Sequence, residues 1–67
     1  MRLIRRFSIR NVRDICGNLQ AGFAPDKDYP ILGYVQEHGV DLLLVANDWD
    51  EFEWIALDRC QFGCVLE

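Results

Sequence analysis

Short apolar runs divided by turn-forming residues fill most of the chain between Lys27 and Phe62, and this pattern constrains the fold more than any other feature. The run 40–46, for example, is bounded by Gly39 and Asn47 and is too short for an ordinary helix. Runs of this length between Gly, Pro, Asn and Asp are typical of β-strands joined by tight turns. The pattern therefore predicts an all-β fold built around a meander of consecutive strands.

The same turn-forming residues mark where the individual strands begin and end. The predicted strands cover residues 29–36, 40–46, 52–56 and 61–66, and a single helical turn is predicted at 57–60. Alternation from Phe7 to Arg10 favours another strand within the first sixteen residues, although their apolar side chains can also be collected on one face of a helix. Residues 17–28 hold Gly, Pro and no sustained period, so they predict a long loop that sends Leu19 and Phe23 into the core.

Side-chain alternation also predicts which residues are buried. Phe52, Trp54 and Ala56 fall on one face of their strand, and core packing is the favoured interpretation for Trp54. Apart from Asp41, the run 40–46 is apolar on both faces, as expected of a central strand. The three cysteines are expected to act as small buried hydrophobic residues.

Length and charge limit the class of protein. A chain of 67 residues has room for one domain, residues 1–67, and little room for a wide catalytic cleft. The net charge is −4, but the first thirteen residues carry five arginines and no acid, whereas the remainder carries two basic and eleven acidic residues. The basic start could attract phosphates, while the acidic remainder opposes nucleic acid and favours a basic partner.

The cysteine count and spacing argue against a metal site or a secreted protein. Cys16, Cys60 and Cys64 are an odd number, which is typical of a reducing compartment, so a cytoplasmic location without a membrane span is expected. Together with His38 they do not match the spacing of zinc knuckles, so neither a metal nor a cofactor is expected. Ser8 and His38 form no known hydrolase motif, and the protein is not expected to be an enzyme.

A family resemblance follows from motifs spread over roughly residues 22–62. They are Gly22 and Phe23, then Lys27, Tyr29 and Ile31, then Asn47, Asp48, Glu51, Phe52 and Trp54, and finally Arg59 and Phe62. With this pattern the chain resembles small phage and prophage proteins with an SH3-like fold. The resemblance and the element order imply a small five-stranded SH3-like barrel with a long first loop and one 3₁₀ turn before the last strand. Asp26 stands where the family usually has Gly, so a different turn geometry is expected there.

The resemblance implies binding of host proteins rather than catalysis, and the candidate contact residues surround one turn. Trp49 lies between acids in D-W-D-E, where burial would draw charged neighbours into the core, so an exposed partner-binding indole is one interpretation and a ring folded onto the protein wall is the other. The leading hypothesis is a phage or mobile-element module that binds and modulates a host protein, with a basic surface as one option. The proposed contact residues are Trp49, Asp48, Asp50 and Glu51, with Tyr34 as a further candidate.

Two alternatives remain open from the sequence. One is a nucleic-acid-binding barrel that uses the basic segment through Arg2, Arg5, Arg6 and Arg10. The other is a structural subunit that forms a homo-oligomer through surplus apolar surface, since hydrophobic residues make up 51% of so short a chain.

Overall fold

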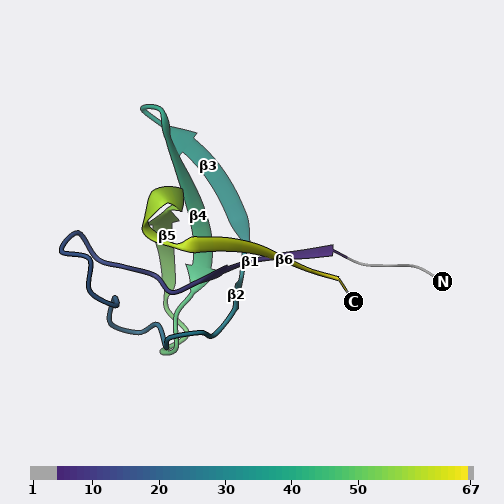
Figure 1. Cartoon of the computed structure of the whole chain (residues 1–67). Coiled ribbons are helices and arrows are strands. Elements are labelled where there is room, and N and C mark those ends of the chain that lie inside the picture. Colours follow the sequence, from purple (N-terminus) through teal and green to yellow (C-terminus); the bar gives the residue numbers. More distant parts are fainter. Residues whose placement is uncertain (1–4, 67) are drawn as a thin grey trace.

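The computed structural model describes residues 5–66, whose strands form two three-stranded antiparallel sheets. The elements in chain order are β1 (Arg5–Arg10), β2 (Tyr29–Pro30), β3 (Gly33–Glu37), β4 (Val40–Ala46), β5 (Phe52–Ala56), the 3₁₀ turn η1 (Leu57–Arg59) and β6 (Gln61–Leu66). One sheet has the order β2-β1-β6 and the other β3-β4-β5. In Figure 1, β1 and β6 run side by side across the β3-β4-β5 sheet. The all-β prediction, the strand in the basic segment and the 3₁₀ turn are therefore confirmed.

The strand expected over 29–36 is divided, and this changes the strand count. The N–H of Ile31 donates to the carbonyl of Phe7 in β1, whereas the N–H of Leu32 donates to the carbonyl of Leu44 in β4. The chain thus leaves one sheet and enters the other between these two residues. The described chain therefore has six strands instead of five, because one straight strand cannot pair with both β1 and β4.

The two sheets do not close into a continuous hydrogen-bonded barrel in the described residues. β5 and β6 are edge strands of different sheets, joined by η1. Figure 1 shows the paired ends of β1 and β6 extending beyond the β3-β4-β5 sheet. The inner side of this β1–β6 ribbon is therefore covered by the second sheet over only part of its length.

The core lies between the two sheets. Ile9, Val12 and Val45 are fully buried there, and Ile31 and Cys60 pack against the cluster; its members are Ile9, Val12, Phe23, Tyr29, Leu43, Val45 and Ile55. Leu43 and Ile55 are direct cross-strand neighbours, so β4 and β5 contribute alternate residues to the same face. From the long loop, Phe23 enters the core as predicted, with its ring edge-on to Tyr29 at 4.9 Å. Leu19 instead remains 38% exposed.

The predicted orientation of β5 is wrong. Ile55 is the residue that β5 buries, whereas Phe52 is 71% and Trp54 50% exposed. The register explains the difference, because Trp54 pairs with Leu44 and Ile55 pairs with the buried Leu43. A strand that is apolar on both sides leaves this choice to its partner strand, since a shift of one residue exchanges the two faces.

The cysteine prediction is also wrong for two of the three side chains. Cys16 and Cys64 are exposed, and only Cys60 is partly buried against the core. Cys16 lies in a turn held by the carboxylate of Asp14, which accepts hydrogen bonds from the N–H groups of Cys16 and Asn18. Cys64 lies on β6 opposite Phe7, in the ribbon that extends past the second sheet.

Across the described residues, no helix has the length and apolar character needed to cross a bilayer.

Candidate functional site

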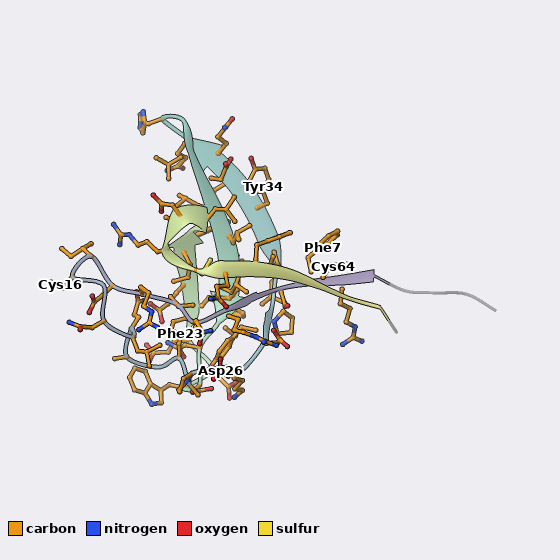
Figure 2. All side chains as sticks on the ribbon, in the orientation of Figure 1. Phe7, Cys16, Phe23, Asp26, Tyr34 and Cys64 are labelled. Atoms are coloured by element: carbon orange, nitrogen blue, oxygen red, sulfur yellow. The ribbon has the colours of Figure 1, made fainter. Side chains whose placement is uncertain are left out.

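An apolar groove lies where the β1–β6 ribbon leaves the second sheet. It has a volume of about 350 Å³ and is lined by Phe7, Ile31, Tyr34, Asp41, Leu43, Leu57 and Phe62. The rings of Phe7 and Phe62 stack with their centroids 5.6 Å apart and remain 47% and 54% exposed. In Figure 2, Phe7 lies at the ribbon and Tyr34 on the neighbouring β3 strand. The groove is thus the uncovered continuation of the core, and its floor includes the core residue Leu43.

One polar pair is built into the wall of this groove. The hydroxyl of Tyr34 donates to Oδ1 of Asp41 over 2.6 Å across the β3–β4 pair. This hydrogen bond raises the pKa of Tyr34, because ionisation would remove the donated proton and place two negative charges together. The bond also holds the phenol ring in one orientation, so Tyr34 presents a fixed aromatic surface although it is 61% exposed.

The β4–β5 turn, residues 47–51, is organised by the buried side chain of Asn47. Its Oδ1 accepts the N–H groups of Trp49 and Glu51 over 2.9 and 3.0 Å. Its Nδ2 donates to Glu53 over 2.6 Å, and the other oxygen of that carboxylate accepts from the side chain of Gln20. An asparagine at this point therefore closes the turn and joins it to the long loop at the same time.

Asp48 is already engaged within the protein. Its Oδ1 accepts from Lys27 Nζ over 2.7 Å and from the hydroxyl of Tyr29 over 3.0 Å. The hydrogen bond from Lys27 holds the pKa of Asp48 below its usual range, and the same pair raises the pKa of Lys27. Since Tyr29 also accepts the N–H of Ala24, this cluster ties the loop to the turn. A partner that used Asp48 would have to displace these contacts.

Trp49 is 62% exposed at the tip of the same turn, and the inner edge of its indole rests on the long loop. A Cβ added at Gly22 would come within 3.2 Å of the Trp49 ring, so the loop passes directly beneath it. The ring thus rests on the protein along one edge and is exposed elsewhere, while a partner contact at Trp49 stays a prediction. Asp50 adopts a positive φ of 59° beside it, and Glu51 is exposed.

The structure does not bring Tyr34 to this tip. Tyr34 pairs with Leu43, and Asp48 follows five residues further along the chain, which corresponds to roughly 15–20 Å of extended strand. The five candidate contact residues therefore divide into the turn, with Trp49, Asp48, Asp50 and Glu51, and the groove, with Tyr34. The sequence analysis did not identify Phe7 or Leu57 as groove residues, because the periodicity of a strand does not tell where its partner sheet ends.

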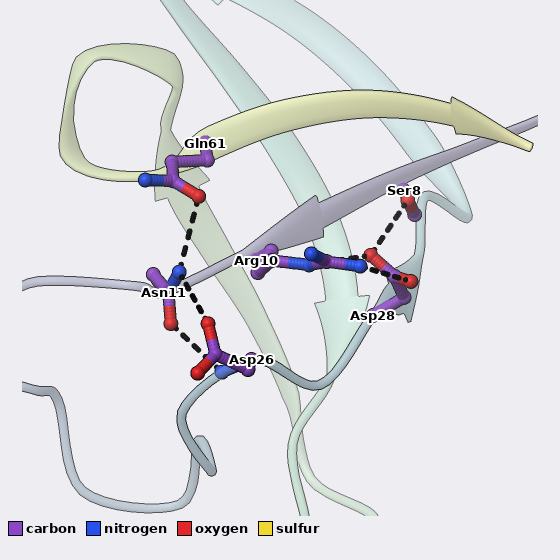
Figure 3. Close-up of polar contacts among 6 residues, drawn as sticks. All are labelled: Ser8, Arg10, Asn11, Asp26, Asp28 and Gln61. Atoms are coloured by element: carbon purple, nitrogen blue, oxygen red, sulfur yellow. Dashed lines mark hydrogen bonds and ion pairs between the residues drawn. The ribbon is translucent and has the colours of Figure 1, made fainter.

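The basic segment is partly neutralised by the protein itself. Figure 3 shows Arg10 facing Asp28, with Arg10 Nη2 2.8 Å from Oδ2 and Arg10 Nε 3.1 Å from Oδ1. This hydrogen-bonded pair raises the pKa of Arg10 and lowers that of Asp28, so the Arg10 charge is not fully available to phosphate. Arg6 is exposed on the same face of β1. Arg2 and the side chain of Arg5 lie outside the described residues.

A second polar cluster in Figure 3 surrounds Asp26 in the long loop. Asp26 takes the left-handed conformation, with a φ of 57°. Its N–H donates to Oδ1 of Asn11 over 2.8 Å, and Asn11 Nδ2 in turn contacts the side chains of Asp26 and Gln61. Asp26 therefore adopts a conformation that glycine reaches more easily, and side-chain hydrogen bonds offset its strain.

No family model, curated protein or solved structure matches this chain significantly. Within residues 5–66, no group of three or more His, Cys, Asp and Glu side chains is arranged to hold a metal ion.

Proposed function

We propose that this protein is a non-enzymatic binding module that holds an apolar segment of another protein in the groove between β1, β3 and β6. The observation that carries the proposal is the pair of stacked rings, Phe7 and Phe62, which are about half exposed above the core. Rigid aromatic side chains of this kind provide much of the energy of protein contacts, because they bury a large area at a small entropic cost.

The groove has the size and chemistry of a site for side chains rather than for a charged ligand. Its volume of about 350 Å³ can accept one or two large apolar side chains. Its only ionisable carboxyl, Asp41, is already hydrogen-bonded to Tyr34. The ligand class that fits is therefore an extended or helical peptide segment with an aliphatic or aromatic anchor.

Charge at one end of the groove adds a preference for basic neighbours of that anchor. Asp41 and Leu57 also line an adjoining depression that contains Asp58. The described chain past residue 13 is strongly acidic, with Lys27 and Arg59 as its basic side chains. A partner segment carrying Lys or Arg beside its apolar anchor would be attracted to this end and correctly oriented.

The finer fold assignment is part of the same proposal. The order β1, long loop, divided strand, β4, β5, 3₁₀ turn and β6 supports an SH3-like barrel, in which one bent strand serves both sheets. Together with the motif resemblance, it supports a cytoplasmic module of phage or mobile-element type that binds and modulates a host protein. We place the main contact in the groove and a secondary one at Trp49, because Asp48 is occupied by Lys27 and Tyr29.

Selection from a random peptide library on the immobilised protein tests the groove directly. The expected ligands have an apolar anchor flanked by Lys or Arg, and their amide chemical-shift footprint covers Phe7, Tyr34 and Phe62. The variant Phe62→Glu should weaken these peptides at least about tenfold, since it places a charge among the aromatic anchors.

Two variants separate the groove from other surfaces. Phe52→Glu introduces the same charge on an exposed phenylalanine of another edge strand and should leave peptide binding unchanged. Trp49→Ala combined with Asp50→Lys should have a smaller effect than Phe62→Glu. Peptides that footprint on the β4–β5 turn and are lost only in this double variant would overturn the assignment of the groove as the main site.

A further inference from the structure

The outward face of the β3-β4-β5 sheet has an unusual composition for a sheet surface. Its residues, read from the cross-strand pairs, are Gly33, Val35, Glu37, Val40, Leu42, Leu44, Ala46, Phe52, Trp54 and Ala56. Glu37, at the end of β3, is the only charged side chain among them. The polar residues of these strands, such as Asp41 and Glu53, point to the same side as the core. An antiparallel sheet with one solvated face normally shows the opposite alternation, with apolar residues inside and polar residues outside.

The largest side chain of this face lies along the sheet. The indole of Trp54 extends across Leu44 toward β3, because a Cβ added at Gly33 would lie 3.5 Å from Leu44 Cβ and 3.9 Å from Trp54 Cη2. Gly33 thus leaves room for the ring to lie on the sheet rather than stand away from it. The ring remains 50% exposed, and Phe52 next to it is 71% exposed.

We propose that this outward face is the interface of a homodimer, in which a second copy packs its own β3-β4-β5 face against the first. Sheets pack face to face about 10 Å apart with their strands nearly aligned, and a two-fold axis lets one surface serve both copies. A small domain with limited core is also a good candidate for stabilisation by association. The proposal is independent of the groove, which opens on the other side of the sheet at Leu43.

The available area is sufficient for a weak dimer. An aromatic residue offers about 150–250 Å² in all, so the exposed parts of Phe52 and Trp54 amount to roughly 250 Å². With the half-buried aliphatic residues and Val40, each copy contributes on the order of 500 Å². The total of about 1,000 Å² is at the lower limit for a specific interface, so the expected dimer is a weak one.

Charge determines the orientation of the two copies and its dependence on salt. The acidic turn with Asp48, Asp50 and Glu51 lies at one end of the sheet, so strands of the two copies that run in opposite directions keep these turns apart. The face itself contributes no ion pair, whereas each copy carries a net charge of −4. Added salt screens this repulsion, so the dimer should become tighter as ionic strength rises.

Sedimentation equilibrium of the full chain, together with a matched pair of variants, tests the proposal. Wild type should change from monomer to dimer as its concentration rises, and more readily at higher salt. Phe52→Glu should be monomeric at all concentrations, whereas Phe62→Glu, the same substitution on another exposed edge strand, should dimerise like wild type. A wild-type protein that stays monomeric up to about 1 mM would overturn the proposal.

A second measurement needs no variant, in case Phe52→Glu fails to fold. Amide chemical shifts of the wild type are followed on dilution. The expected shifts map to residues 33–35, 42–46 and 52–56, the strands that carry the outward face. Shifts confined to the groove residues Phe7, Tyr34 and Phe62, or to the free edge of β6, would show that the copies associate through a different surface and would refute the assignment.

Discussion

Replacing Gly22 by alanine should destabilise the protein much more than replacing Gly17, although both glycines have almost the same backbone conformation. Their φ angles are +88° and +84°, so an added Cβ meets the same left-handed strain of about 1 kcal/mol at either position. The reduction in unfolded-state entropy is also the same and cancels in the comparison. The pair therefore isolates the contacts of the added methyl group.

Those contacts differ completely between the two sites. At Gly17 nothing lies within 4 Å of the new Cβ, whereas at Gly22 it would meet the Trp49 ring at 3.2 and 3.3 Å and Asn47 Cβ at 3.3 Å. The exposed indole can move aside, but Asn47 is buried and held by its hydrogen bonds to the turn. Overpacking of this kind costs about 1–3 kcal/mol, so Gly22→Ala should lose roughly 2–4 kcal/mol in total and Gly17→Ala about 1 kcal/mol.

The assay is urea unfolding followed by far-ultraviolet circular dichroism. A chain of 67 residues has a free energy of unfolding of about 3–10 kcal/mol, so the difference between the variants is a large fraction of the total. In a Trp54→Phe background the remaining indole reports on Trp49, and its emission should shift to longer wavelength only in Gly22→Ala. Equal losses within about 0.5 kcal/mol, with unchanged emission, would refute the argument that the loop supports Trp49.

Three further predictions concern the turn, its ion pair and the basic segment. Asn47→Ala should lower the free energy of unfolding in urea by about 2–3 kcal/mol, because three side-chain hydrogen bonds disappear. Asn47→Asp should not recover this loss at pH 7, because it keeps the acceptor but places a second carboxylate against that of Glu53. The pKa of Asp48 is lowered by Lys27 from its ordinary 3.8, so the pair stabilises fully above that value and is lost as pH falls through and below it. The thermal midpoints of wild type and Lys27→Met should accordingly differ at pH 7 and converge below pH 4, and a constant difference would contradict this linkage. Because Arg10 is paired with Asp28, the protein should elute from heparin at low salt; a steep salt dependence of retention would favour the nucleic-acid alternative.

Strand positions were predictable where local chemistry is unambiguous. The run 40–46 between Gly39 and Asn47 and the closing strand 61–66 both have the predicted bounds, because turn residues interrupt apolar sequence there. The division of 29–36 was not predictable, because each backbone group of Ile31 and Leu32 pairs with a different distant strand. No local pattern encodes that exchange of partners.

The candidate site was even less predictable from local sequence patterns than the strand bounds. Trp49 at an exposed turn could be anticipated from its acidic neighbours, and its exposure agrees with that expectation. The groove could not be anticipated. Phe7 and Phe62 line it only because β1 and β6 extend beyond the sheet that covers the rest of the core. Tyr34 is exposed, but the structure places it with these two rings rather than with Trp49, and its partner contact stays a prediction.

The sequence alone determined that this chain forms short antiparallel strands. Alternating apolar residues and turn residues are enough for this, because both act within a few positions along the chain. Which side of β5 faces the core was decided only in the tertiary structure. Phe52 and Trp54 are as apolar as Ile55, so burial energy by itself does not distinguish the two faces. The register set by the Asn47 turn and by pairing with β4 buries Ile55 beside Leu43 and turns both aromatic rings outward.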